Sequence, residues 1–471
     1  MGLSAAFEIG SAGLRIHQVA MEVMSENIAN VNTPGYSRQR VILETAPPTT
    51  HNGFPLASGV KIATVERYYD ALLQKQLVNA GTTSGYNTTT LQVLQQVEPA
   101  FNELAKDGLG AAITDFFNAW QDLTLNPIGT AERQTVLSKA EMLTDQFRYA
   151  SRTLTDAMVT QDESLTSLTS DINAKLKDIA YLNGQIKTTE LIHGNANEMR
   201  DQRDYLIRQL GESVAVSFVE NTDGTTDVSY TDGTGTYSLV SGSTVVNNFT
   251  LVANGTLPDP LSTTKHDVQL TPTGGGAAVT IAPTTGKLGA TLVMRDTTLQ
   301  GYLTDLDTLA NSIVSDVNGL HVSTGGRPTY DLNGAAGGLF FDSAGTTAAT
   351  ISLDSNVLGA PANIAAALSN FSGDSSNALA IAQLNSKVNN YSSSYKTLVA
   401  QIGLDVQAAK SVTSQDAAFM KQLQTLRDSN SGVSLDEELA ALIKYQRSYQ
   451  ASARLITTAT EMMDTVIAMM R

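Results

Sequence analysis

Side chains that could perform catalysis are few in this sequence, and they do not form a pattern that any reaction requires. The chain has no cysteine, so a thiol nucleophile, thiolate metal ligands and disulfides are all excluded. No Gly-x-Ser-x-Gly elbow occurs. The histidines lie far apart and outside any metal-binding motif; they are His17, His51, His193, His266 and His321. We therefore expect no catalytic residues, no metal site and no cofactor: the protein is not an enzyme.

One charged cluster could still suggest phosphate binding or acid–base work. It comprises Arg200, Asp201, Arg203 and Asp204, within a helical stretch that runs from residue 197 to residue 210. Neighbouring charges of opposite sign at this spacing are typical of a solvated helix face with local ion pairs. We therefore expect this cluster to be structural and exposed to solvent.

The overall charge and hydropathy exclude two classes of partner. The net charge of −16 argues against nucleic acid, because phosphate contacts require clustered Lys and Arg. No apolar run approaches the ~18 residues of a membrane helix. The first residues lack both the charged and the apolar segment of a secretory signal, so we expect no cleaved signal peptide. Export by a specialised route stays open.

The two ends of the chain carry the strongest pattern, an apolar stripe that repeats every 3.5 residues as in a coiled coil. At the amino end its apolar members are Leu3, Phe7, Leu14, Met21, Met24, Ile28 and Val31. At the carboxy end they are Leu435, Leu439, Leu442, Tyr449, Ile456, Met463, Ile467 and Met470. A lone helix cannot bury such a stripe, so we expect the two terminal helices to meet and to form an assembly interface.

Between the ends, several long helices and one β-rich segment are predicted. The first helix should stop near residue 30, because Pro34 and Gly35 favour a turn, and a strand should follow over 37–44. Helical patterns follow over 59–106, 130–191, 296–320 and 377–426. The helix over 130–191 would be roughly 90 Å long at ~1.5 Å per residue. Short alternating runs separated by Asp-Gly turns predict β-hairpins after residue 213.

These elements predict a mainly α fold with an inserted β domain. Residues 1–45 and 430–471 should form a discontinuous terminal coiled-coil domain, along the axis of an assembly. Residues 46–212 and 290–429 should form an elongated, mainly helical rod. Residues 213–289, rich in Thr and Gly, should form a β-rich outer domain with a core of its own.

The turn after the first helix resembles a family signature. Residues 25–39 are Ser-Glu-Asn-Ile-Ala-Asn-Val-Asn-Thr-Pro-Gly-Tyr-Ser-Arg-Gln, similar to the amino-terminal signature of the bacterial flagellar rod, hook and hook-associated proteins. Segments 197–210, 331–341 and 431–456 are also similar to that family, and they occur in the same order. The resemblance adds signature residues to the assembly interface, namely Asn27, Asn30, Pro34, Gly35 and Tyr36. Locally, the asparagines are equally explained by helix capping and turn formation.

The resemblance implies a structural protein that joins hook to filament. It implies export through the flagellar type III apparatus and a place outside the cell, at the hook–filament junction. The partners implied are further copies of the chain in a helical lattice, the hook protein, the adjacent junction protein and an export chaperone at the carboxy-terminal helix. The chain is short for this family, which implies that an outer domain of larger members is absent. Two alternatives stay open: a hook or distal rod protein of the same family, and a secreted adhesin or hydrolase that uses the β-rich segment.

Overall fold

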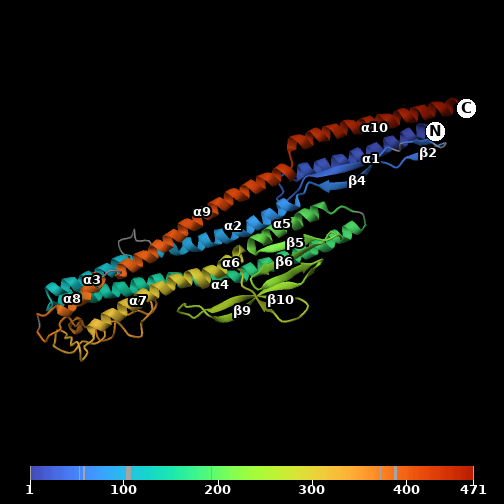
Figure 1. Cartoon of the computed structure of the whole chain (residues 1–471). Helices are drawn as coiled ribbons and strands as arrows, with labels where there is room; N and C mark the ends of the chain where they lie inside the picture. Colours follow the sequence, from blue (N-terminus) through green and yellow to red (C-terminus); the bar gives the residue numbers. More distant parts are fainter. Residues whose placement is uncertain are drawn as a thin grey trace.

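The computed structural model describes residues 2–51, 54–56, 59–101, 108–192, 194–371, 373–386 and 390–469. The molecule is elongated, and most of its helices run along its length (Figure 1). The amino-terminal and carboxy-terminal helices lie side by side at one end, while the strands of the β-rich segment lie along one flank of the middle (Figure 1). This is the predicted fold class, a mainly helical chain with a β-rich insertion.

The terminal end is built from helix α1 (Gly2–Ala29) and helix α10 (Leu435–Met469), which pack along each other. Strand β1 (Gln39–Thr45) follows the turn and pairs antiparallel with β4 (Val60–Arg67), while β2 (Thr49–His51) pairs with β3 (Phe54–Leu56). The expectation of helix from residue 59 is wrong for 60–67. Three of these residues are valine or isoleucine, whose β-branched side chains favour strands, and β1 supplies their hydrogen-bonding partners.

The rod contains helices that pack around two large core clusters, which α2 and α4 both join. They are α2 (Ala71–Val97), α3 (Leu109–Leu125), α4 (Thr130–Leu191), α5 (Asn197–Ser213), α6 (Gly286–Val293), α7 (Leu299–His321) and α9 (Tyr391–Ser431). Trp120 is fully buried among aromatic rings that include Phe116 and Phe340, so it is a core anchor. Helix α2 continues unbroken through its glycines. One of them, Gly85, allows close packing on α5, because a Cβ there would lie 2.2 Å from the carbonyl oxygen of Glu212.

Shorter elements complete the rod. The 3₁₀ turns are η1 (Glu98–Phe101), η3 (Pro361–Asn363) and η4 (Gln383–Ser386), and a π-helical turn, η2 (Met294–Thr298), joins α6 to α7. The last helical stretch, expected as one helix over 377–426, is instead α8 (Ser376–Ala382), then η4, then α9.

The β-rich segment forms two antiparallel sheets. One has the order β5-β6-β7-β8, from Val216–Glu220, Thr226–Asp232, Gly235–Ser241 and Thr244–Val245. The other has the order β11-β10-β9, from Val279–Thr280, Thr264–Pro272 and Asn247–Thr256. Their buried side chains belong to one cluster with Ile172 and Ile179 of α4. The expectation of a separate β core is therefore wrong, because side chains of α4 and α5 complete it.

Candidate functional site

A buried asparagine ties the two ends of the chain together. The side-chain NH₂ group of Asn27 donates to the carbonyl of Gln39 and to Oε2 of Glu438, each over 2.9 Å. Its oxygen accepts from the Tyr36 hydroxyl and from the backbone N–H of Gln39, each also over 2.9 Å. All four hydrogen-bonding positions of the amide are used. Asn27 therefore fixes α1, the signature turn, β1 and α10 to one another.

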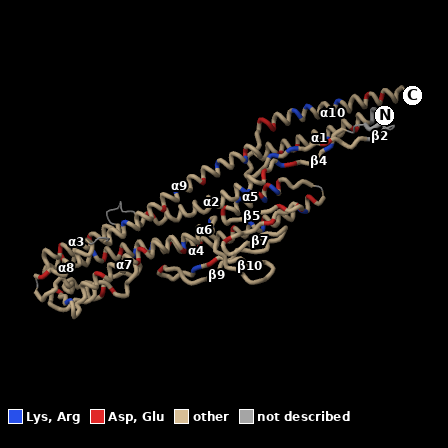
Figure 2. The backbone as a smooth tube through the Cα atoms, viewed as in Figure 1, with Lys and Arg blue, Asp and Glu red and all other residues tan. Residues whose placement is uncertain are grey.

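The first turn of α10 is held by an ion pair with Arg38. Glu438 is 0% exposed, and its Oε1 lies 2.6 Å from Nε of Arg38, while the exposed Glu437 accepts from Nη1 of the same guanidinium over 2.8 Å. The backbone N–H of Arg38 also donates to the carbonyl of Ser431, at the end of α9, over 2.8 Å. Figure 2 shows these opposite charges close together where α1 meets the start of α10.

Because Ser431 ends α9 and Glu438 lies in the first turn of α10, Arg38 holds both sides of the break between these two helices (Figure 1). A second clamp acts from α9, where Nη2 of Arg427 donates to the carbonyl of Tyr36 over 2.8 Å. The direction of α10 relative to the rod is therefore set by side chains of the signature turn. We call Asn27, Tyr36, Arg38, Arg427 and Glu438 the polar joint.

Helix α5 supports the polar joint through side-chain contacts. Asp201 accepts from the backbone N–H of Ser37 over 2.7 Å and pairs with Nη1 of Arg67 over 2.7 Å. The same Arg67 nitrogen lies 2.8 Å from Oδ2 of Asp204. Burial raises the pKa of the Asp201 carboxyl, and the Arg67 guanidinium opposes that rise. Arg203 is buried as well and donates to the carbonyl of Gly224 over 2.6 Å.

The expectation of a solvated, self-paired helix face is therefore wrong for this cluster. Asp201, Arg203 and Asp204 are all buried, and Arg200 pairs with Glu190, outside the cluster, over 2.7 and 2.8 Å. The main partners come from other elements, which local spacing could not reveal.

The signature turn itself combines local and tertiary roles. Asn30 acts locally, since it donates to the carbonyl of Glu26 over 3.1 Å and accepts from the Thr33 hydroxyl over 3.0 Å. Gly35 is required by the fold: its φ is +88°, and a Cβ there would lie 2.9 Å from Cβ of Tyr205 in α5. Pro34 is exposed beside it. The capping and turn interpretation thus holds for Asn30, whereas Asn27 has tertiary partners.

Helices α1 and α10 face each other through small and polar residues. The antiparallel neighbours are Asn27 with Glu438, His17 with Tyr445, Gly13 with Ser452 and Gly10 with Ile456. A Cβ on Gly10 would lie 2.8 Å from Cγ1 of Ile456, and one on Gly13 would lie 2.9 Å from Oγ of Ser452. The backbones are therefore close at this point, and the glycines permit it.

The predicted stripes divide between this contact and the open surface. Near the contact, Met24 and Tyr36 are buried, and the half-buried members are Leu14, Met21, Ile28, Val31, Leu442 and Ile456. The exposed members are Phe7, Leu435, Leu439, Tyr449, Met463 and Ile467. For Leu3 only the backbone is described, and Met470 lies outside the described residues.

An apolar row on α10 therefore remains open to solvent. Leu435, Leu439 and Ile443 follow at intervals of four on one face, and each is about half exposed, at 45%, 47% and 52%. We call these three the open row. Farther along α10, Met463, Val466 and Ile467 are also exposed. The sequence stripe included Leu435 and Leu439. It missed Ile443, because its 3.5-residue spacing passes from Leu439 to Leu442, and it missed Glu438 and Gly13, because they are not large apolar residues.

The contacts of the terminal end join helices and turns to one another. Within the described residues, no group of three or more His, Asp or Glu side chains is placed to hold a metal ion. In that same part of the chain, no helix is long and apolar enough to cross a membrane. The terminal end combines the polar joint with an adjacent apolar helix face, the open row, which has no partner among the described residues.

Three family models match the sequence. The model for the helical domain of flagellar hook-associated protein FlgK matches residues 94–341, more than half of the chain. The model for the C-terminal region of flagellar basal body rod FlgEFG proteins matches residues 427–469. The flagella basal body rod protein model matches residues 7–36. The two end models thus cover the helices that meet at the polar joint.

Curated relatives match over almost the whole length. Flagellar hook-associated protein 1 of Bacillus subtilis (strain 168) is 28% identical over 502 residues, covering 98% of this chain and 97% of the relative. The protein of the same name from Escherichia coli (strain K12) is 27% identical over 560 residues, covering 99% of this chain and all of the relative. That alignment exceeds the 471 residues of this chain, so this relative has segments that the chain lacks.

A solved structure has a similar fold. The flagellar hook junction protein FlgK from Burkholderia pseudomallei superposes with a TM-score of 0.65 at 17% identity, over 76% of this chain and 100% of that chain. At this identity the likeness concerns the fold alone.

Proposed function

This chain belongs to the flagellar hook-associated protein FlgK family, and from that premise we propose how its surfaces join hook to filament. It is a structural protein of the bacterial flagellum, with its role at the junction of hook and filament. The FlgK model in the middle of the chain argues against a hook or rod protein, whose models match the two ends. No observation favours an adhesin or a hydrolase.

The observation that carries the proposal is the open row of α10 beside the polar joint. The row packs against terminal helices of neighbouring copies, which build a helical lattice around a common axis. Burying each leucine contributes ~2 kcal/mol per copy, and this gain is repeated at every subunit. The polar joint keeps α10 in one direction, so that all copies present the row in the same way. The assembly interface comprises the exposed members of the predicted stripe, with the open row as its centre, while the buried stripe and signature residues hold α1 and α10 in place.

The partners follow from the position of this protein between two different assemblies, the hook and the filament. The hook protein lies below the lattice, and the adjacent junction protein lies above it. An export chaperone covers the carboxy-terminal helix before assembly, since an uncovered apolar face promotes aggregation. The protein reaches the outside of the cell through the flagellar export apparatus. Neither nucleic acid nor membrane is a partner.

Complementation of a strain that lacks the gene tests this proposal. Leu439→Asp places a carboxylate in the open row, where an unpaired charge in an apolar interface is strongly disfavoured. Because Leu439 is 47% exposed in the single chain, the monomer should keep its melting temperature. We expect normal secretion, hooks without filaments and flagellin shed into the medium.

Lys444→Asp, at an exposed position on the same helix, is the matched control and should leave filaments normal. Secreted protein is measured by immunoblot and filaments are counted by electron microscopy. Normal filaments with Leu439→Asp would contradict the role of the open row.

A further inference from the structure

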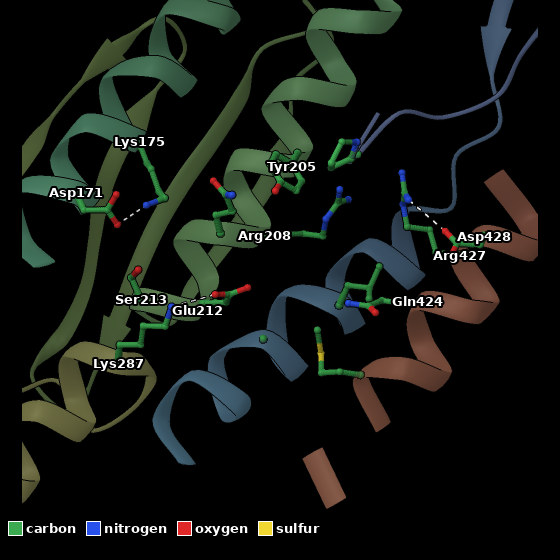
Figure 3. A pocket seen from close by; sticks show the side chains of 16 residues that line it. Asp171, Lys175, Tyr205, Arg208, Glu212, Ser213, Lys287, Gln424, Arg427 and Asp428 are labelled. Atoms are coloured by element: carbon green, nitrogen blue, oxygen red, sulfur yellow. Dashed lines mark hydrogen bonds and ion pairs between the residues drawn. The ribbon is translucent and has the colours of Figure 1, made fainter. Parts of the chain in front are cut away.

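A charged cleft lies next to the polar joint. It has a volume of ≈ 680 Å³ and is enclosed by α2, α4, α5, α6 and α9, with Pro34 and Gly35 of the signature turn at one edge (Figure 3). Leu77 and Met420 give it a small apolar part. The cleft is therefore wide enough for a chain segment and is continuous with the proposed assembly site.

Four cations line the cleft, but only three of them have a carboxylate partner (Figure 3). Lys175 pairs with Asp171, Lys287 lies 3.1 Å from Glu212, and Arg427 lies 3.4 Å from Asp428. In Figure 3 the Asp171–Lys175 pair lies at the left, the Glu212–Lys287 pair lies below it, and the Arg427–Asp428 pair lies at the right. Among the described residues, no carboxylate forms an ion pair with Arg208.

The surroundings of Arg208 leave its charge poorly compensated. Its Nη1 donates to the neutral amide of Gln74 over 2.7 Å. Burial and, second to it, the positive charge of Arg427 together lower the pKa of the guanidinium to about 10. Asp201 and Asp204 are near enough to oppose this shift, but both carboxylates are paired with Arg67. A partly buried charge in this position destabilises the single chain unless an anion approaches it.

We propose that this cleft binds a carboxylate side chain of a second copy of the chain, held by Arg208 and Arg427. An arginine fork matches the two oxygens of a carboxylate, and two guanidiniums side by side favour an anion strongly. The chain carries a net charge of −16, so neighbouring copies repel each other except where an acidic side chain meets a basic cleft. This contact rests on the proposed lattice and adds a defined polar anchor to its apolar interface.

The substitution Arg208→Gln separates this role from a structural one. Removing an uncompensated charge should leave the melting temperature of the full-length monomer unchanged or raised, whereas removing a structural residue lowers it. Secretion should stay normal, and the amount of protein retained on isolated hooks should fall about tenfold, as expected for one lost charge-assisted contact. Arg148→Gln, at an exposed arginine of α4, is the control and should change neither quantity.

Arg208→Lys keeps the charge and loses the fork, so its retention should lie between wild type and Arg208→Gln. A lower melting temperature for Arg208→Gln together with normal retention on hooks would overturn the proposal. If Leu439→Asp abolishes filaments while Arg208→Gln does not reduce retention, the cleft contact fails and the proposed function stands. If both variants assemble normally, the proposed function fails as well.

A photo-crosslinking residue in place of Gln209, which lines the cleft, identifies the occupant. Illumination of intact flagella should give an adduct between two copies of this chain, mapped by mass spectrometry to a peptide with Asp or Glu. An adduct with another flagellar protein alone would overturn the assignment to a second copy. The remaining alternative is that the cleft binds a free anion rather than a side chain. Sodium phosphate is therefore titrated into the monomer at constant ionic strength. A rise in melting temperature that Arg208→Gln abolishes would assign the cleft to a free anion instead.

Discussion

At the scale of single residues, two neighbouring glutamates show how burial decides the weight of an ion pair. Glu437 and Glu438 both pair with Arg38, but the side chain of Glu437 is 64% exposed and that of Glu438 is 0% exposed. Water screens the first pair, and such pairs contribute ~0–1 kcal/mol. Loss of Glu438 would leave Arg38 and the amide of Asn27 without their buried partner, at a penalty of ~3 kcal/mol or more.

Glu438→Ala should therefore loosen the polar joint, whereas Glu437→Ala should not. We expect the backbone amides of the first turns of α10 to exchange with solvent about a hundredfold faster in Glu438→Ala, because ~3 kcal/mol corresponds to that factor. Hydrogen exchange measured by mass spectrometry checks this. Equal exchange in the two variants would show that the joint does not depend on the buried carboxylate.

His321 gives the rod a predictable response to acid. Its Nδ1 lies 2.7 Å from the carbonyl of Gly338, and its Nε2 accepts from the N–H of Ala365 over 2.8 Å, so the folded state requires the neutral ring. Burial lowers the pKa of His321 from 6.5 to about 4. As the pH falls from 6.5 towards 4, the unfolded chain binds a proton that the folded chain does not. The stabilisation that depends on neutral His321 is thus present above pH 6.5 and is lost progressively as the pH falls from 6.5 towards 4.

Between pH 7 and pH 5 this histidine should remove about 2 kcal/mol of unfolding free energy. His321→Gln stays neutral at both values, so its melting temperature should fall less between pH 7 and pH 5 than that of the wild type, although it starts lower. Differential scanning calorimetry gives both differences. An equal fall in the two proteins would remove His321 from the acid response.

Only part of this residue-scale detail could be predicted. The sequence pointed to Pro34 and Gly35 as a turn, because a turn depends on local chemistry. It could not place Asp201 next to the polar joint, because its partner Arg67 is 134 residues away and forms part of a strand taken for helix.

At the scale of elements, the terminal stripe proved to contain two different surfaces. Leu442 lies between Glu438 and Tyr445, which both face α1, and it is half-buried; Leu439 belongs to the open row. An apolar period finds a helix and its stripe, but it ignores the glycines and serines that allow close packing. At Glu438, Tyr445 and Ser452, the residue that faces α1 therefore lies one position before the one that the predicted stripe placed in the contact.

This division predicts different effects of one substitution at two leucines. Leu442→Asp should weaken the packing of α10 on α1, so that trypsin cleaves α10 of the dilute monomer several times faster. Leu439→Asp should leave that cleavage rate unchanged, because its side chain is already solvated. Both variants should lack filaments. Equal protease sensitivity of the two monomers would contradict the division of the stripe.

At the scale of the whole molecule, α4 is the long helix against which the other parts pack. It runs over 62 residues from Thr130 to Leu191, contributes to both large core clusters and carries both sheets. Asn173 of α4 exchanges hydrogen bonds with the backbone of Phe249 over 2.7 and 2.9 Å, as a strand neighbour would. Asn183 binds the backbone of Thr226 in the other sheet in the same manner, over 2.8 and 3.0 Å.

The sheets should consequently be inseparable from the stability of the rod. Replacing residues 216–280 with a short Gly-Ser linker would expose Ile172, Ile179 and their neighbours on α4, and each buried isoleucine is worth ~2 kcal/mol. We expect the shortened protein to melt at lower temperature and to aggregate. The same deletion combined with Ile172→Gln and Ile179→Gln removes most of the exposed apolar surface and should restore solubility. If both shortened proteins then hold filaments equally well, the sheets act on stability alone. A shortened protein that melts like the wild type would show that the β-rich segment has a core of its own after all.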